Sequence, residues 1–232
     1  MTKDKKKNIS KVAITKYSAK SIADAVDKLK EVALENKRNF IESLDLAVNL
    51  GIDARQSNQN VKGSVLLPNG SGKDIRIVVF TASEEEQKEA LKLGAKFAGL
   101  EDLVAKISDG FLDFDCCIAT PESMPKISKV SKKLGPRGLM PSPKNGTVTT
   151  DIKKAIADAL KGKIDFKNDK AGTVHCLAGK INFETSALVQ NVETLLKAFR
   201  ESKPESSKGK FIKELFLSTT MGPSVQIDIS SI

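Results

Sequence analysis

The sequence predicts a mixed α/β and α+β protein of two domains, in which a smaller domain is inserted into a larger one. The pattern of apolar and polar residues changes twice along the 232-residue chain. Residues 71–162 alternate continuous apolar runs with helical patterns, whereas both flanks have the patterns of half-buried strands and amphipathic helices. Neither flank has enough strands to close a sheet alone. Residues 1–70 and 163–232 are therefore expected to form one discontinuous outer α+β sandwich domain around the inserted segment 71–162.

The first flank predicts one long helix and two strands. A Lys-rich stretch, residues 1–20, is expected to be a flexible basic tail. Apolar residues recur at three- and four-residue spacing over 22–35, which predicts a helix. Alternation over 44–50 predicts a half-buried strand, a polar loop follows over 51–60, and a short strand is expected at 65–67.

The inserted segment predicts a small parallel sheet wrapped by helices, because its strands alternate with helices. The helix that opens at Ser83 carries Glu86 three residues later, the spacing of a capping box. An open basic loop, 135–150, precedes the last helix. The predicted strands are 75–80, 96–98 and 114–119, and the later helices are 101–108, 122–134 and 152–160.

The second flank, residues 163–232, has the same pattern of apolar and polar residues as the first. It predicts a hairpin over 164–176 that turns around 168–172, a helix over 186–200, and two strands, 211–217 and 225–229.

Glycines stand at both crossings between the predicted domains. Gly70 and Gly72 lie at the first crossing and Gly162 at the second, and their backbone freedom predicts a hinge. A rigid interface with ordinary turn glycines is the alternative that the sequence leaves open.

The charge balance predicts a polyanionic partner. Lys and Arg number 38 against 29 acidic residues, for a net charge of +9, of which +7 falls on the flanks and +2 on 71–162. Nucleic acid is the usual partner of such a surface. Three cysteines and one histidine exclude a disulfide framework and a four-ligand zinc site, and indicate a reducing compartment. We expect no secretory signal and no membrane span.

An enzyme on the inserted domain is the competing hypothesis, and the sequence lacks its motifs. Gly70–Lys73 resembles a phosphate loop, but the required Gly and Ser/Thr positions hold Leu67 and Asp74. No dinucleotide fingerprint follows a strand. His175 is interpreted as a structural histidine in a hairpin strand. We therefore predict no catalytic residue, no metal site and no cofactor.

Three segments are candidates for RNA contact. The stiff loop Leu134–Val148 lacks acids and presents Arg137 and Lys144, although it could instead pack the two domains together. The turn Thr219–Pro223 offers hydroxyls and bare backbone that can approach a 2′-hydroxyl, or is an ordinary Gly-Pro turn. Lys37–Phe40 joins a basic pair to an aromatic ring that could stack on RNA or belong to the core.

These segments, together with Asn168-Asp169-Lys170, resemble the bacterial-type ribosomal protein L-one family of the large-subunit lateral stalk. The similarity runs from about 11 to 229. Its signature is Leu-Gly-Pro-Arg-Gly-Leu-Met-Pro-x-Pro-Lys-x-Gly-Thr-Val at 134–148, and Gly51–Gly63 and Thr219–Pro223 add independent support.

The resemblance implies a two-domain protein whose inserted domain is doubly wound and Rossmann-like. It implies a cytoplasmic, ribosome-associated protein, monomeric when free, that binds the stalk region of large-subunit rRNA among other ribosomal components. It also implies that the protein assists release of transfer RNA from the exit site and represses translation of its own operon mRNA. A regulatory RNA binder outside the ribosome is a further hypothesis.

The resemblance assigns RNA contact chiefly to the outer domain. Two departures are expected to weaken individual contacts: Asn39 stands where Lys is common in the family, and Lys167 where Arg is frequent. Substitution of Thr220 by Val or Met221 by Asp is expected to abolish RNA binding and leave the fold intact. Secondary RNA or interdomain contacts are expected at Lys133, Arg137 and Lys144. The predicted RNA-binding residues are Lys37, Phe40, Ser43, Lys167, Asn168, Asp169, Lys170, Thr219, Thr220, Met221 and Gly222.

Overall fold

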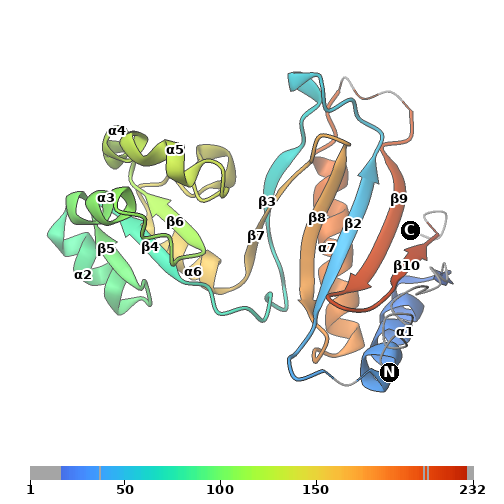
Figure 1. The fold of residues 1–232 in the computed structure, drawn as a ribbon. Coiled ribbons are helices and arrows are strands. Elements are labelled where there is room, and N and C mark those ends of the chain that lie inside the picture. Colours follow the sequence, from blue (N-terminus) through green and yellow to red (C-terminus); the bar gives the residue numbers. More distant parts are fainter. Residues whose placement is uncertain (1–16, 37, 206, 208, 229–232) are drawn as a thin grey trace, which may run out of the picture.

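The computed structural model describes residues 17–228 except 37, 206 and 208. Most of the predicted basic tail, residues 1–16, therefore lies outside the described residues, and so does Lys37. Figure 1 shows two groups of elements that are joined by two adjacent extended segments, β3 and β7. One group holds a five-stranded sheet and two long helices, and the other holds a three-stranded sheet with shorter helices on both sides. The predicted mixed α/β and α+β class is confirmed.

The larger sheet combines strands from both flanks of the chain. Its order is β1-β10-β9-β2-β8, and every neighbouring pair is antiparallel except β1 with β10. The strand β2 is central and pairs with β9 on one side and with β8 on the other. The strands are β1 (Tyr17–Ala19), β2 (Ser43–Leu50), β8 (Thr173–Lys180), β9 (Ile212–Thr219) and β10 (Ser224–Ile227).

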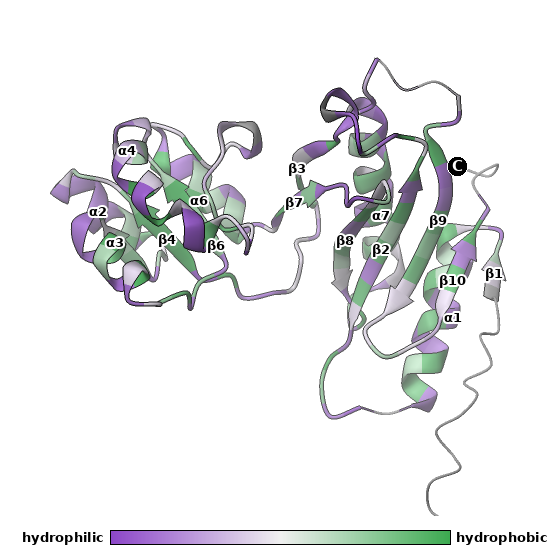
Figure 2. Cartoon of the chain, turned by 45° about the horizontal axis from the view of Figure 1, so that its top comes forward, coloured by the Kyte–Doolittle hydropathy of each residue, from purple (hydrophilic) through white to green (hydrophobic). Residues whose placement is uncertain are grey.

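The helices α1 (Ile22–Glu35) and α7 (Thr185–Glu201) cover one face of this sheet. Alternate side chains of β2, from Leu44 to Leu50, are buried against them, and Figure 2 shows the resulting alternation of hydropathy along the strands. The other face carries the intervening, more exposed side chains. The hydroxyl of Ser21 caps α1 by accepting the N–H of Asp24 (3.1 Å).

The strands β3 (Lys62–Leu66) and β7 (Lys163–Lys167) form an antiparallel ladder of their own between the two groups. The predicted hairpin over 164–176 is therefore wrong in its pairing: only a single bridge, Asn168 with Val174, links its two arms. Phe166 explains the departure of β7. Its ring packs edge-on against Phe199 with centroids 4.9 Å apart, in the core beneath β3.

The smaller sheet is fully parallel, in the order β5-β4-β6, and both of its faces are covered. In the central strand β4 (Ile77–Phe80), Ile77 and Val79 pack toward α2 (Glu84–Lys92) and α6 (Ile152–Leu160). Val78 and Phe80 pack toward the opposite helices. This arrangement is a doubly wound sheet. Its remaining elements are β5 (Phe97–Gly99), α3 (Glu101–Ser108) and β6 (Cys116–Ala119).

Two local predictions in this segment are corrected. The helix expected over 122–134 is instead a series of short turns, and Pro125 stands in the first turn of one of them, where a missing N–H is tolerated. Ser83 is the N-cap of α2, but its side chain makes no capping bond; Glu86 instead accepts a hydrogen bond from the hydroxyl of Thr81. The turns are η2 (Pro121–Ser123), α4 (Met124–Ile127), η3 (Ser128–Val130) and α5 (Ser131–Leu134).

A fully buried asparagine ties the first crossing to the larger sheet. Asn191 of α7 donates through Nδ2 to the carbonyl oxygens of Ala178 (2.9 Å) and Gly70 (3.1 Å). Its Oδ1 accepts the N–H of Asn69 (3.2 Å). One buried side chain thus satisfies backbone groups of the neighbouring strand β8 and of the partly buried crossing.

We expect Asn191→Leu to lower the free energy of unfolding by about 3 kcal/mol, because it leaves three backbone groups without partners at nearly constant volume. Urea denaturation measures the change. Gln190→Leu is the matched control, since Gln190 is exposed on the same helix and loses only a solvent-exposed bond from Nδ2 of Asn69 (3.0 Å), which should cost less than about 1 kcal/mol. Equal destabilisation of the two variants would contradict this role of Asn191.

Candidate nucleic-acid interface

The turn after β9 is fastened to the first residue of β2. The N–H of Thr220 donates to the carbonyl oxygen of Ser43 (3.1 Å), and the N–H of Ser43 donates to Oγ1 of Thr220 (3.0 Å). These bonds extend the β2–β9 ladder by one residue beyond the Leu44–Thr219 pair. The hydroxyl of Thr220 therefore holds the turn in place.

The next two residues of this turn have different roles. Met221 is 58% exposed, and its N–H donates to a carboxylate oxygen of Glu42 (3.3 Å). Gly222 has no room for a side chain, because a Cβ there would lie 2.1 Å from Oγ1 of the buried Thr219. The bare backbone expected at Gly222 is thus a steric requirement, and Met221 is the side chain that the turn presents to solvent.

Two charged residues that the sequence analysis did not single out support this end of the sheet. Glu42 is almost fully buried and also faces Arg38, with Oε1 3.8 Å from Nε. Lys180, at the end of β8, donates to the hydroxyl of Ser43 (2.9 Å). Nothing in the sequence marks Glu42 as buried, because its environment is made by a turn that lies far along the chain.

The two apolar residues that precede Glu42 are exposed. Phe40 is 52% exposed and Ile41 55% exposed, so the alternative that Phe40 belongs to the core is wrong. We call Phe40, Ile41 and Met221, with Arg38 and Lys180, the Met221 edge. It combines apolar surface with cations, a composition that suits the sugar, base and phosphate of RNA.

The turn between β7 and β8 divides into structural and exposed residues. Asn168 is buried, and its Oδ1 accepts the N–H of Val61 (2.8 Å). The carboxylate of Asp169 accepts the N–H groups of Thr173 and Ala171 (2.8 Å each), which lowers its pKa. Asn168 and Asp169 thus build the turn, and Lys167 and Lys170 are its exposed cations.

The predicted RNA-binding residues lie at opposite ends of the larger sheet. Ser43 pairs with Lys180 at one end of the β2–β8 ladder, and Asn49 pairs with Thr173 at the other. An eight-residue strand spans about 25 Å. The Met221 edge and the Lys167–Lys170 turn are therefore separated by the open face of the sheet, on which Asp45 and His175 lie. Partial desolvation raises the pKa of Asp45, against the opposing charge of Lys180.

The basic loop 135–150 also has a structural part and an exposed part. At its far end, Asn145 of the turn η4 (Pro143–Asn145) donates to the carboxylate of Asp165 on β7, so this part packs the two groups of elements together. Arg137 is exposed, and Lys133 donates to the carbonyl oxygen of Ser108 (2.6 Å). The side chain of Lys144 lies outside the described residues.

The three crossing glycines all adopt positive φ, with values of 71° at Gly70, 67° at Gly72 and 99° at Gly162. A Cβ on Gly162 would lie 2.7 Å from the backbone nitrogen of Ser71, so the two crossings touch through their backbones. Left-handed backbone and close approach both require glycine here. The hinge itself stays a prediction.

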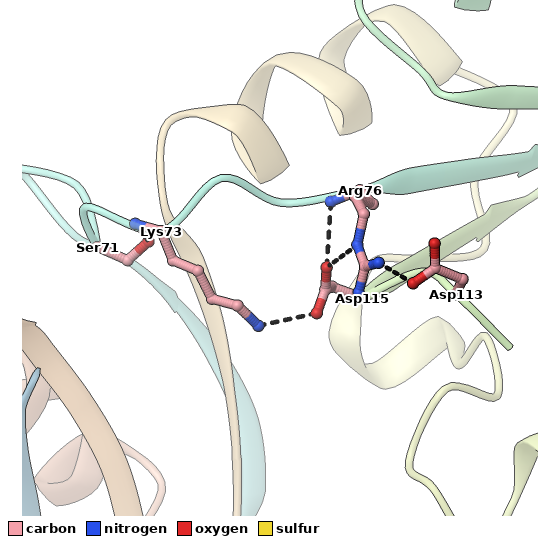
Figure 3. A network of polar contacts seen from close by, with 5 residues as sticks. All are labelled: Ser71, Lys73, Arg76, Asp113 and Asp115. Atoms are coloured by element: carbon pink, nitrogen blue, oxygen red, sulfur yellow. Dashed lines mark hydrogen bonds and ion pairs between the residues drawn. The ribbon is translucent and has the colours of Figure 1, made fainter. Parts of the chain in front are cut away.

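The Gly70–Lys73 segment does not form a phosphate loop. Figure 3 shows Lys73 pointing to Asp115, with Nζ 2.8 Å from the carboxylate, and Arg76 bridging Asp115 and Asp113. The hydrogen bond from Lys73, followed by those from Arg76, lowers the pKa of Asp115 to about 2. The lysine that would bind a nucleotide phosphate is thus already paired with a carboxylate.

Burial shifts the cysteine thiols of the described residues away from the reactive thiolate form. Desolvation raises the pKa of Cys116 to about 11 and that of Cys176 to about 12. Among the described residues, no three His, Cys, Asp or Glu side chains gather as a metal site would require. Within the same ranges, no helix combines the length and apolar character needed to cross a bilayer.

Comparisons with known proteins give a family match and several similar relatives. The model of the family described as "Ribosomal protein L1p/L10e family" matches residues 28–223. "Large ribosomal subunit protein uL1" of Coxiella burnetii is 44% identical over 232 residues, covering 100% of this chain and 97% of the relative. That of Colwellia psychrerythraea is 47% identical over 218 residues, covering 94% and 91%. That of Ruthia magnifica is 44% identical over 232 residues, covering 100% and 98%.

The chain belongs to the ribosomal protein L1p/L10e family. Its relatives are bacterial, so the resemblance drawn from the loop 134–148 and the turn Thr219–Pro223 is confirmed. Proteins of this family are structural components of the ribosome rather than enzymes, and family membership therefore confirms the non-enzymatic interpretation.

We expect Asp115→Asn to destabilise the protein by about 1 kcal/mol at neutral pH, because it removes the ion pairs with Lys73 and Arg76. The loss is small because both cations are partly exposed and screened by solvent. The pKa of Asp115 is lowered on folding, so its contribution is present above about pH 4 and is lost as the pH falls toward 2. Thermal denaturation from pH 7 to pH 2 should show the difference between variant and wild type shrinking.

Asp113→Asn is the control for this experiment. Asp113 is more exposed and makes no contact with Lys73 among the described bonds, so we expect a smaller change in stability at neutral pH. A constant difference between Asp115→Asn and wild type across this pH range would contradict the assignment.

Proposed function

We propose that this protein is a constituent of the large ribosomal subunit that binds the stalk region of large-subunit rRNA through residues 1–70 and 163–232. The observation that carries the proposal is the fastening of Thr220 to Ser43, which holds Met221 exposed beside Phe40. A rigid, exposed turn can be complementary to one folded RNA shape. The names of the relatives, which are large ribosomal subunit proteins, support the same assignment.

The recognition combines three physical contributions at the Met221 edge. Exposed cations such as Arg38 neutralise phosphates and release counterions, which gives affinity without sequence preference. Phe40 and Met221 offer apolar surface on which a base or ribose can stack. The narrow turn at Gly222 lets RNA approach the backbone closely, where shape and 2′-hydroxyl contacts give specificity.

We further propose that the segment 71–162 moves as an inserted domain about Gly70, Gly72 and Gly162, and that it assists release of transfer RNA from the exit site. The exposed Arg137, beside the lysines of α4 to α5, supports a contact with RNA on that domain. Release of exit-site transfer RNA from ribosomes that carry Arg137→Glu tests this role. An unchanged release rate would contradict it.

We also propose that the protein represses translation of its own operon mRNA. A messenger segment that folds like the stalk would fit the same Met221 edge, so the two RNAs should exclude each other. Competition between a stalk fragment and the mRNA leader for the free protein tests this. Simultaneous binding of both RNAs would contradict a shared site.

We expect Met221→Asp to weaken binding to a folded rRNA stalk fragment by about 10- to 100-fold, because it replaces a stacking surface by a negative charge. The exposed position should leave the thermal midpoint unchanged. Leu91→Asp is the matched control, since Leu91 is 50% exposed on α2, far from the Met221 edge. Binding of Met221→Asp within threefold of the control would contradict the proposed site.

Thr220→Val extends the same titration and revises the expectation that it spares the fold. Because its hydroxyl accepts the N–H of Ser43, valine should weaken RNA binding and also destabilise the turn by about 1 kcal/mol. Thr220→Ser keeps the hydroxyl and should restore both properties. A variant Thr220→Val with unchanged stability would show that the bond to Ser43 does not hold the turn.

A further inference from the structure

A second basic surface lies at the end of the larger sheet opposite the Met221 edge. A hollow of about 800 Å³ lies where α7 ends, β9 begins and β10 ends. Its rim carries four exposed cations, Arg200, Lys203, Lys210 and Lys213. Its floor is apolar and includes Phe211, Ile212 and Ile227. We call this surface the α7 hollow.

The backbone around the α7 hollow brings these cations together in two ways. Gly51 donates its N–H to the carbonyl oxygen of Phe211, and a Cβ on Gly51 would lie 2.2 Å from the carbonyl oxygen of Lys210. Only glycine lets the loop before β9 approach so closely. The register between β2 and β9 then shifts, which leaves Lys213 as the extra residue of a β-bulge and re-aims its side chain.

The positive surface continues beyond the hollow itself. Arg200 also lines an adjoining hollow of about 550 Å³ between α7 and the start of α1, where Lys197 and one acid, Glu193, lie as well. The N-terminal residues of α1, Ser21 to Ala23, face this second hollow with the positive end of the helix dipole. On the other side of Leu50, the turn with the exposed Lys167 and Lys170 flanks the same end of the sheet.

We propose that the α7 hollow binds the phosphodiester backbone of an RNA segment distinct from the one at the Met221 edge. Four cations and one carboxylate, that of Asp228, line the hollow, so positive charge is in excess. A bound polyanion relieves the repulsion among the cations. The apolar floor accommodates ribose and base while the rim contacts phosphates. Lys213 and Thr219 lie six residues apart on β9, about 20 Å, so one phosphate or one nucleotide cannot occupy both surfaces.

RNA fits the α7 hollow better than an acidic peptide does, because the chain belongs to a family of ribosomal proteins, which work among RNA. The apolar floor also favours RNA, because ribose and base can cover Phe211 and Ile227 while phosphates contact the rim. The binding is expected to be tolerant of sequence, because the cations of the rim contact phosphates rather than base edges.

The test uses the full protein and a 20-nucleotide oligouridine RNA, followed by fluorescence anisotropy at several salt concentrations. The triple variant Lys203→Ala/Lys210→Ala/Lys213→Ala should bind this probe at least about tenfold more weakly than wild type, and its salt slope should fall by about 2. Its affinity for the folded stalk fragment should stay within about threefold. This separates the α7 hollow from the Met221 edge, whose own variant Met221→Asp should lose the stalk fragment instead.

A charge-matched control separates a site from net charge. Lys88→Ala/Lys92→Ala/Lys106→Ala removes the same charge from exposed positions of α2 and α3. It should weaken oligouridine binding by less than threefold. Equal losses in the two triple variants would overturn the proposal. A polyglutamate peptide that binds the wild-type hollow while oligouridine does not would also overturn it, in favour of an acidic protein.

A measurement on the unmodified protein does not depend on the variants. Lysine acetylation, read by mass spectrometry with and without oligouridine, should show Lys203, Lys210 and Lys213 protected at least about fivefold by the RNA. Lys88 and Lys92 should react equally in both samples. Full reactivity of the three rim lysines in the RNA-bound protein would overturn the proposal.

Discussion

The pairing of β2 on both sides is the constraint on which the rest of the structure depends. This strand lies before the segment 71–162, and both of its neighbours, β8 and β9, lie after it. The larger sheet therefore cannot form until the chain has returned from the smaller one. The two crossings must lie side by side for this return, which explains why Gly162 contacts the backbone of Ser71 and why Asn191 is buried beneath Gly70.

The same pairing builds both surfaces that we propose to bind RNA. Its register with β9 places Ser43 against Thr220 and so builds the Met221 edge. At the other end of β2, Gly51 and the β-bulge at Lys213 build the α7 hollow. A single rigid strand thus fixes the spacing of two surfaces, one suited to shape recognition and the other to a polyanion. The strand backbone behind both surfaces is already ordered by the sheet, which lowers the ordering cost of binding.

Local elements of the fold could be predicted from the sequence, whereas features that depend on distant residues could not. The spacing of apolar residues over 22–35 and the cap at Ser21 are local, and α1 follows them. The partner of β7, the buried carboxylate of Glu42 and the bonds of Asn191 depend on residues far along the chain, and no short-range pattern marks them. Asn168 shows the same limit within the candidate site: its motif indicates RNA contact, but its side chain is buried in the turn.

The central claim is that a shaped turn, rather than net charge, selects the RNA. The most direct test titrates the wild-type protein against a folded rRNA stalk fragment and against a plain duplex of equal length, each at several salt concentrations. Shape recognition predicts that the stalk fragment binds at least about 100-fold more tightly, with a ratio that persists as salt rises. Equal affinity for the two RNAs at every salt concentration would contradict the claim and leave charge alone as the source of binding.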